Sequence, residues 1–298
     1  MGIIDDIRLR YRQGGMLLRI IYINIGVFLL LNLVALVEWL FAMPSMQAQS
    51  WVAVPSHIGE LIYRPWTLLT YCFSHYDVLH ILFNMLWFYW MGRIFLEFFT
   101  PKQLSGLYII GGIGGALLYV LAYNLLPALA HAHSYLIGAS ASVIAIVVAA
   151  AVYMPDYRIG LLFLGQVALK WVALVMVLLS VLSITGSNAG GNIAHVGGAL
   201  IGMWFAMAIR RGCDITAWLN RALDAVSGLL HRAPRQVREP VGGTAYRGGG
   251  ATPHRTSRRQ QPEPTEADLD RVLDKIRRSG YASLTEQERD ILFRASRR

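Results

Sequence analysis

Residues 134–154 read SYLIGASASVIAIVVAAAVYM, an uncharged and mostly apolar stretch in which two serines, Ser140 and Ser142, lie two residues apart. Most serines in such stretches are packing residues, because the side chain is small and can hydrogen-bond back to its own helix. The surrounding chain is similar in character. Of its 298 residues 55% are hydrophobic and 15% are charged, whereas soluble domains average about 25% charged residues. This composition places the chain in a lipid bilayer.

Apolar runs long enough to cross a bilayer recur along the chain. Each is close to the ~20 residues that a helix needs to cross a ~30 Å hydrocarbon core, and turn residues such as Pro101, Pro127 and Pro155 separate them. We therefore predict an all-α membrane protein with six transmembrane helices, near 17–42, 77–99, 104–126, 135–154, 167–186 and 192–209. A transporter or channel would predict repeated halves or broken helices, and neither is evident.

Lysine and arginine mark one side of this predicted bundle. The loops on the other side carry only Arg64. Because basic loops stay cytoplasmic, we predict that both termini are cytoplasmic and that the 43–76, 127–134 and 187–191 loops face outward. The residues that set this orientation are Arg8, Arg10, Arg12, Arg19, Lys102, Arg158, Lys170, Arg210 and Arg211.

Five segments are expected along the chain. They are a cytoplasmic N-terminal segment at 1–16, a membrane domain at 17–211, an amphipathic juxtamembrane helix at 212–232, a disordered linker at 233–262 and a helical cytoplasmic segment at 263–298. The last segment is predicted to form a small helical hairpin, with Thr285 and Glu288 as the capping box of its second helix. It would either dock a cytoplasmic partner or form a passive tail.

The net charge of +9 is concentrated after the sixth span. A basic tail can bind nucleic acid, but basic residues beside a membrane helix more commonly contact anionic lipid. We therefore predict the lipid bilayer as a partner and no nucleic-acid partner.

Four polar side chains are predicted to meet in the outer third of the membrane. His80 and Asn84 are four residues apart, so they share a face near the outer end of the second span. Ser140 lies about one turn into the fourth span, and His195 about one turn into the sixth. Polar residues at this depth are costly and are functional by default, although a lone histidine could make a structural hydrogen bond instead.

These side chains favour nucleophilic catalysis. A neutral imidazole such as His195 can activate the hydroxyl of Ser140 by accepting its proton. The side chains of His80 and Asn84, with the backbone N–H of Ser140, could donate to the oxyanion that forms when a carbonyl is attacked. We place no Asp or Glu at this depth, so a Ser–His dyad fits better than a triad. The histidines could alternatively bind a metal, but a convincing third ligand is missing, and we predict no metal and no cofactor.

Small residues would allow the close helix contact that this chemistry needs. Gly198 and Gly202 form a GxxxG pair in the sixth span, and the fourth span offers Gly138 and Ala141 among other small residues. If these two faces pack together, His195 comes within reach of Ser140. Ordinary helix packing would use the same glycines.

At this point the sequence resembles the rhomboid intramembrane serine proteases. The resemblance covers about residues 40–210, nearly the whole membrane domain, and it implies a six-helix fold, a Ser–His dyad and hydrolysis of peptide bonds in or beside transmembrane segments. It also implies transmembrane proteins as substrates, a bacterial inner-membrane location and an active site toward the outer leaflet. The 263–298 segment resembles a short helical extension of some bacterial members. The matching motifs are Gly138-Ala139-Ser140, His80 with Asn84, Ala194-His195 with Gly198 and Gly202, the segment RPWTLLTYCFSH at 64–75, and Gly92 with Glu97.

The resemblance favours Ser140 over Ser142 as the nucleophile, because two residues along a helix are rotated by about 200° and cannot both face His195. Three positions depart from the family's pattern: Ala141 replaces a glycine, Thr67 replaces an arginine and Ile144 replaces a tyrosine. The alternative function is a catalytically silent rhomboid-like protein that binds membrane-protein clients.

Overall fold

The computed structural model describes residues 15–42, 47–161, 165–230 and 266–279, together with residues 284, 285, 288 and 291. The predicted linker at 233–262, nearly all of the predicted segment at 1–16 and most of the second C-terminal helix lie outside these residues. The chain forms two units, which divide between residues 235 and 236. The elements of the first unit are α2 (Met16–Leu40), α3 (Gln47–Val52), β1 (Val54–Pro55), α4 (Ile58–Tyr63), α5 (Thr67–Thr70), the 3₁₀ helix η1 (Tyr71–Phe73), α6 (Val78–Phe98), α7 (Pro101–Leu125), β2 (Tyr135–Leu136), α8 (Ser140–Tyr153), β3 (Arg158–Leu161), β4 (Gly165–Ala168), α9 (Leu169–Leu182), α10 (Ala189–Arg210) and α11 (Ala217–Leu230); the second unit contains α12 (Glu266–Ser279).

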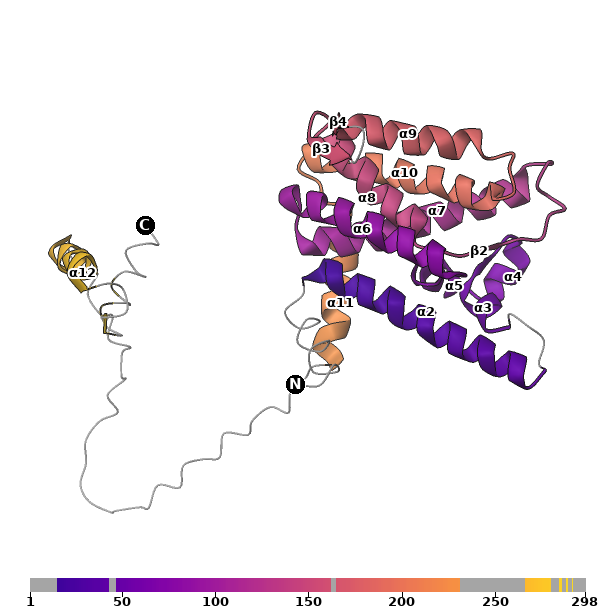
Figure 1. Cartoon of the computed structure of the whole chain (residues 1–298), viewed down its shortest axis with the longest axis horizontal. Helices are drawn as coiled ribbons and strands as arrows, with labels where there is room; N and C mark the ends of the chain where they lie inside the picture. Colours follow the sequence, from indigo (N-terminus) through magenta and orange to yellow (C-terminus); the bar gives the residue numbers. More distant parts are fainter. Residues whose placement is uncertain are drawn as a thin grey trace, which may run out of the picture. The chain divides into compact units, whose positions relative to one another are not determined.

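Six apolar helices form the bundle of the first unit, which confirms the predicted all-α membrane fold (Figure 1). Among the described residues, α2, α6, α7 and α10 have 21 to 25 residues and are apolar enough to cross a membrane. The helices α8 and α9 have 14 residues each, or about 21 Å of length at 1.5 Å per residue. The chain is a multi-pass membrane protein, while the count of six full crossings stays a prediction.

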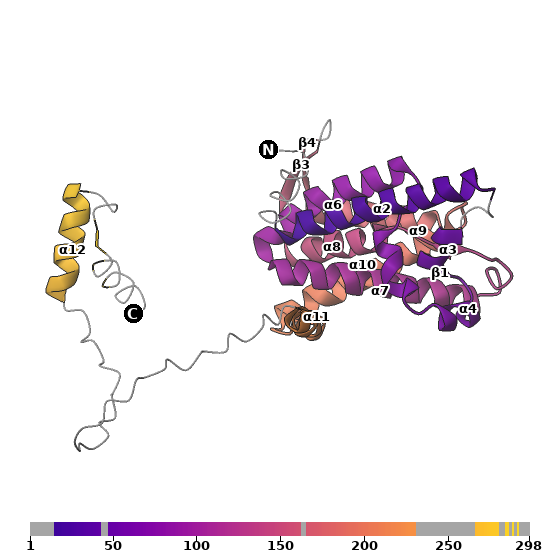
Figure 2. The same ribbon diagram turned by 90° about the horizontal axis from the view of Figure 1, so that it is seen from below.

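Two short antiparallel strand pairs were not predicted. β2 pairs with β1, with Tyr135 opposite Pro55, and β3 pairs with β4. The first pair explains why α8 begins at Ser140 and not at residue 135, as predicted, because residues 135 and 136 are extended. In both views α3 and α4 lie at one end of the bundle, whereas β3, β4 and α11 lie at the opposite end (Figures 1 and 2).

The central helix is α8, which packs against α6, α7, α9 and α10. Every residue from Ala141 to Ala151 is buried, as expected for a helix that is apolar on all sides. Gly198 and Gly202 of α10 face the backbone of Ala141 and Ala145, and a Cβ atom on either glycine would collide with the facing carbonyl oxygen. The small residues of α8 and α10 therefore allow the two backbones to touch.

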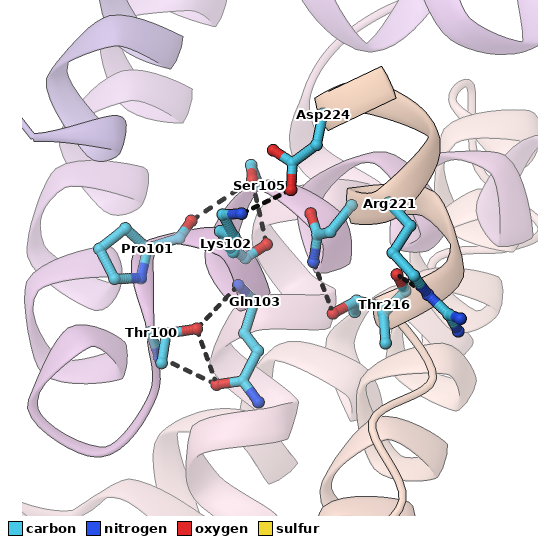
Figure 3. Close-up of polar contacts among 10 residues, drawn as sticks. Thr100, Pro101, Lys102, Gln103, Ser105, Thr216, Arg221 and Asp224 are labelled. Atoms are coloured by element: carbon cyan, nitrogen blue, oxygen red, sulfur yellow. Dashed lines mark hydrogen bonds and ion pairs between the residues drawn. The ribbon is translucent and has the colours of Figure 1, made fainter. Parts of the chain in front are cut away.

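At the other end of the bundle, α11 is attached to the beginning of α7 (Figure 3). There α7 opens with a capping box, in which Thr100 and Gln103 each accept a hydrogen bond from the other's backbone N–H, at 3.2 and 2.9 Å. Lys102 of α7 forms an ion pair of 2.6 Å with Asp224 of α11. Thr216, just before α11, is fully buried. Trp218 of α11 is exposed, and the amphipathic juxtamembrane helix expected at 212–232 stays a prediction.

In the second unit, Lys275 of α12 binds the carboxylate of Glu288 at 2.8 Å. Glu288 Oε2 also accepts hydrogen bonds from the backbone N–H and the hydroxyl of Thr285, at 2.8 and 3.0 Å, and its own N–H lies 3.4 Å from the Thr285 hydroxyl. The predicted capping box of these two residues is therefore present. The hydrogen bond from Lys275 lowers the pKa of Glu288 from its ordinary value of 4.5 to about 2.

Candidate active site

Ser140 is the first residue of α8, at the point where the chain leaves β2. Gly138 makes this turn with a φ of +125°, a conformation that residues with a side chain rarely adopt. The N–H of Gly138 donates to the carbonyl of Tyr71 at 3.0 Å, and the N–H of Ala139 lies 3.4 Å from His75 Nε2. The loop before α6 thus holds the beginning of α8, and Ser140 lies in the first helical turn, where backbone N–H groups have no partner within the helix.

His195 lies on α10 with its imidazole against Ser140. The Nε2 atom of His195 is 2.7 Å from the Oγ atom of Ser140, and both side chains are half-buried. Gly198 lies one turn further along the same helix and contacts Ala141, the residue after Ser140. The close approach of α10 to α8 therefore brings a hydroxyl and an imidazole from two helices into hydrogen-bond distance.

The other imidazole nitrogen has a partner that the sequence did not suggest. His195 Nδ1 is 3.1 Å from the hydroxyl of Ser180 on α9. The only signal in the sequence was that Ser180 is a lone polar residue after Lys170 in the run LKWVALVMVLLSVL, and such serines are usually packing residues.

His80 faces Ser140 across a cavity of about 300 Å³ with a mostly polar lining. Its ring lies directly over Gly138, where an added Cβ atom would be 2.7 Å from Cε1 and 2.8 Å from Nε2. Tyr76, Tyr135 and Asn188 also line this cavity. An imidazole N–H and a hydroxyl therefore face a space that can accept a polar group of a ligand.

Asn84 is not directed at the cavity in this structure. Its Nδ2 atom donates to the carbonyl of His80, one turn earlier in α6, at 2.9 Å. The carboxylate nearest to these residues along α6 is Asp77, which caps the helix by accepting from the N–H of His80 at 2.8 Å.

Ser142 and Ala141 both contact the glycines of α7. Ser142 is fully buried, and a Cβ atom on Gly112 of α7 would lie 2.7 Å from its hydroxyl. The methyl group of Ala141 occupies the space that Gly115 leaves, since a Cβ atom there would lie 2.7 Å from it. The additional methyl beside Ser140 is thus accommodated by a glycine on the neighbouring helix.

Comparison with known proteins gives the following matches. Residues 63–212 match the model of the rhomboid domain, and residues 258–298 match a family of unknown function, DUF6576. The chain is similar to RHOMBOID-like protein 12, mitochondrial, of Arabidopsis thaliana, with 30% identity over 49% of this chain and 47% of that protein. It is also similar to Rhomboid protease GlpG of Klebsiella pneumoniae, with 29% identity over 39% of this chain and 44% of that protein. Presenilin-associated rhomboid-like protein A, mitochondrial, of Danio rerio is 26% identical over 45% of this chain and 34% of that protein. The chain spans about half the length or less of these curated relatives.

Proposed function

Because the chain belongs to the rhomboid family, we propose that it is an intramembrane serine endopeptidase, which cleaves membrane proteins in or beside their transmembrane segments. The observation that carries this proposal is the distance of 2.7 Å between Ser140 Oγ and His195 Nε2. A hydroxyl this close to an imidazole nitrogen can transfer its proton as it attacks a carbonyl carbon.

The reaction proceeds in two halves. His195 Nε2 accepts the proton of Ser140 as its oxygen bonds to the substrate carbonyl carbon, and the proton then passes to the leaving amine as the peptide bond breaks. Water next attacks the resulting ester, with His195 again as the base, and releases Ser140 and the new carboxylate. Among the residues that the structure describes, no carboxylate is hydrogen-bonded to Ser140 or His195, and Asp77 instead caps α6.

The oxyanion of the tetrahedral intermediate is stabilised by donors around the cavity. Two observations support His80 and the backbone N–H of Ser140 in this role: His80 lines the same cavity as Ser140, and the first turn of α8 offers unpaired N–H groups and the positive end of its dipole. Asn84 joins them only after its side chain rotates away from the His80 carbonyl. Gly138, Ala141, Gly198 and Gly202 serve as packing residues that let these groups approach one another.

The location of Ser140 supports an active site toward the outer leaflet. Ser140 follows β2, whose partner β1 lies between α3 and α4 in the chain, at the end of the bundle opposite α11 (Figure 2). With basic residues on the cytoplasmic side, both termini are cytoplasmic and the site opens outward, in a bacterial inner membrane. Substrates are transmembrane segments with Gly, Pro or small residues near the cut, because a helical segment must unwind before its peptide bonds are accessible.

Reconstitution into liposomes with single-span reporter proteins tests the proposal. Wild type and Ser142→Ala should yield the same two fragments by mass spectrometry, and Ser140→Ala should yield none. A folded wild type that captures the reporter proteins without cutting them would replace the proposal with a catalytically silent protein that binds membrane clients. The matched pair of serine variants separates a loss of chemistry from a loss of folding.

A further inference from the structure

The hydroxyl of Ser180 lies between His195 and the backbone of its own helix. Ser180 Oγ is 3.1 Å from His195 Nδ1 and donates to the carbonyl of Met176, one turn earlier in α9, at 2.9 Å. Ser180 is only 6% exposed, whereas the neighbouring Leu179 and Val181 are 58% and 46% exposed. At its outer end α9 therefore presents this hydroxyl to the bundle and its leucines and valines to the membrane.

The positions of the hydrogens follow from counting donors. A serine hydroxyl has one hydrogen to donate and two lone pairs with which to accept. We assign the hydrogen of Ser180 to the Met176 carbonyl, which leaves its lone pairs for His195, and with this assignment the contact of 3.1 Å requires a hydrogen on Nδ1. In a neutral imidazole with hydrogen on Nδ1, the other nitrogen is an acceptor. That nitrogen, Nε2, is the one that lies against Ser140.

We propose that Ser180 is a positioning residue, which holds His195 in the orientation and tautomer that can accept the proton of Ser140. This inference rests on the proposed protease function and adds a third helix to it. Hydrogen bonds then run from Ser140 of α8 through His195 of α10 and Ser180 of α9 to the carbonyl of Met176. In serine proteases with a triad, a buried carboxylate orients the histidine in the corresponding way; here a neutral hydroxyl does so.

Two consequences follow if the Ser180 hydroxyl is the acceptor for His195 Nδ1. A hydroxyl stabilises the imidazolium that forms during reaction less than a carboxylate does, so its removal should slow the reaction by about 10- to 100-fold, the range for a hydrogen bond to a charged group. The contact also depends on the position of α9, whose end is joined to α10 by a second bond, from Asn192 Nδ2 to the carbonyl of Ser183 at 2.7 Å. A movement of α9 away from α10 would thus release the base.

The test compares Ser180→Thr with Ser180→Val in the full-length protein, in detergent or liposomes. The two variants have nearly the same shape, because both side chains branch at Cβ, but threonine keeps the hydroxyl where valine has a second methyl group. Ser183→Ala is the control, since it also removes a serine hydroxyl at the end of α9. Ser183 is exposed, and it contributes only its backbone carbonyl, which alanine keeps, to the contact with Asn192. The measurements are the rate of covalent labelling by a fluorophosphonate, and kcat and KM for a transmembrane reporter.

The valine variant should label and turn over about 10- to 100-fold more slowly than the threonine variant, with KM unchanged. Ser183→Ala should match wild type. Equal rates for Thr and Val would overturn the inference and leave the proposed protease function intact. The inference would also be overturned if the two variants differed only in KM, or if the slower variant had lost thermal stability in proportion to its rate. Ser180 would then be a packing residue. A folded wild type that does not label would instead overturn the protease function, and the role of Ser180 with it.

Discussion

Replacing Gly198 with alanine should separate α10 from α8 and so weaken the contact between His195 and Ser140. The added Cβ atom would collide with the carbonyl oxygen of Ala141 and lie 2.9 Å from its carbonyl carbon and 3.1 Å from its Cα atom. These atoms belong to the backbone of α8, which is buried from Ala141 to Ala151, so no side-chain rotation can make room for the methyl group.

The size of the effect follows from these distances. Carbon atoms that are not bonded prefer separations of about 3.5 to 4.0 Å, so α10 must retreat by roughly 0.5 to 1 Å at this point. His195 lies one turn away, and its 2.7 Å contact with Ser140 would then exceed the ~3.2 Å limit of a good hydrogen bond. A displacement of about 1 Å can reduce a rate by about 100-fold, and overpacking should cost about 1–3 kcal/mol of stability.

The assay is the cleavage rate of a transmembrane reporter, measured with thermal unfolding on the same preparations. Gly26→Ala in α2 is the matched control, because an added Cβ atom at Gly26 meets no atom within 4 Å. We expect Gly198→Ala to lose about two orders of magnitude in kcat, while Gly26→Ala keeps the wild-type rate. If both variants cleave equally fast, the close packing of α10 on α8 does not position the dyad, and the structural explanation is wrong.

Three further predictions concern other parts of the chain. Gly138→Ala should abolish fluorophosphonate labelling, because residue 138 has a φ of +125° and its Cβ atom would lie 2.7 Å from the His80 ring; labelling at the wild-type rate would contradict this. Thr100→Ala should lower the free energy of unfolding by about 1 kcal/mol through loss of the capping box of α7, whereas Lys102→Ala, which breaks an exposed ion pair, should cost less than about 1 kcal/mol. Because the folded-state pKa of Glu288 is lowered from 4.5 to about 2, its contribution to the stability of the second unit is complete above pH 4.5 and is lost as the pH falls to about 2. Hydrogen exchange in α12 should therefore be faster in Glu288→Gln than in wild type above pH 4.5, and the difference should vanish near pH 2; a difference that does not depend on pH would contradict this.

The sequence predicted those parts of the fold that depend on local composition. Long apolar runs became the membrane helices, and the small residues of the fourth and sixth predicted spans lie on the contact between α8 and α10. His195 and Ser140 were expected at one depth because each is about one turn from the outer end of its span. Their separation depends on how the helices pack, and only the structure supplies it.

Other features depend on partners far away in the chain and could not be read from local patterns. The strand pair of β1 and β2 joins residues about 80 positions apart, and neither two-residue strand carries a pattern of its own. Asn84 was expected to donate into the site, but the carbonyl of its own helix competes for its amide. Ser180 was missed because a single serine in an apolar helix has the same appearance whether it packs or orients a histidine.

The most direct test of the proposed chemistry is covalent labelling of the purified protein by a fluorophosphonate, with the modified residue identified by mass spectrometry. We predict that wild type and Ser142→Ala carry the adduct on Ser140, and that Ser140→Ala and His195→Ala carry none. An adduct on another serine, or undiminished labelling of Ser140 in the His195→Ala variant, would contradict the proposal that these two residues form the catalytic dyad.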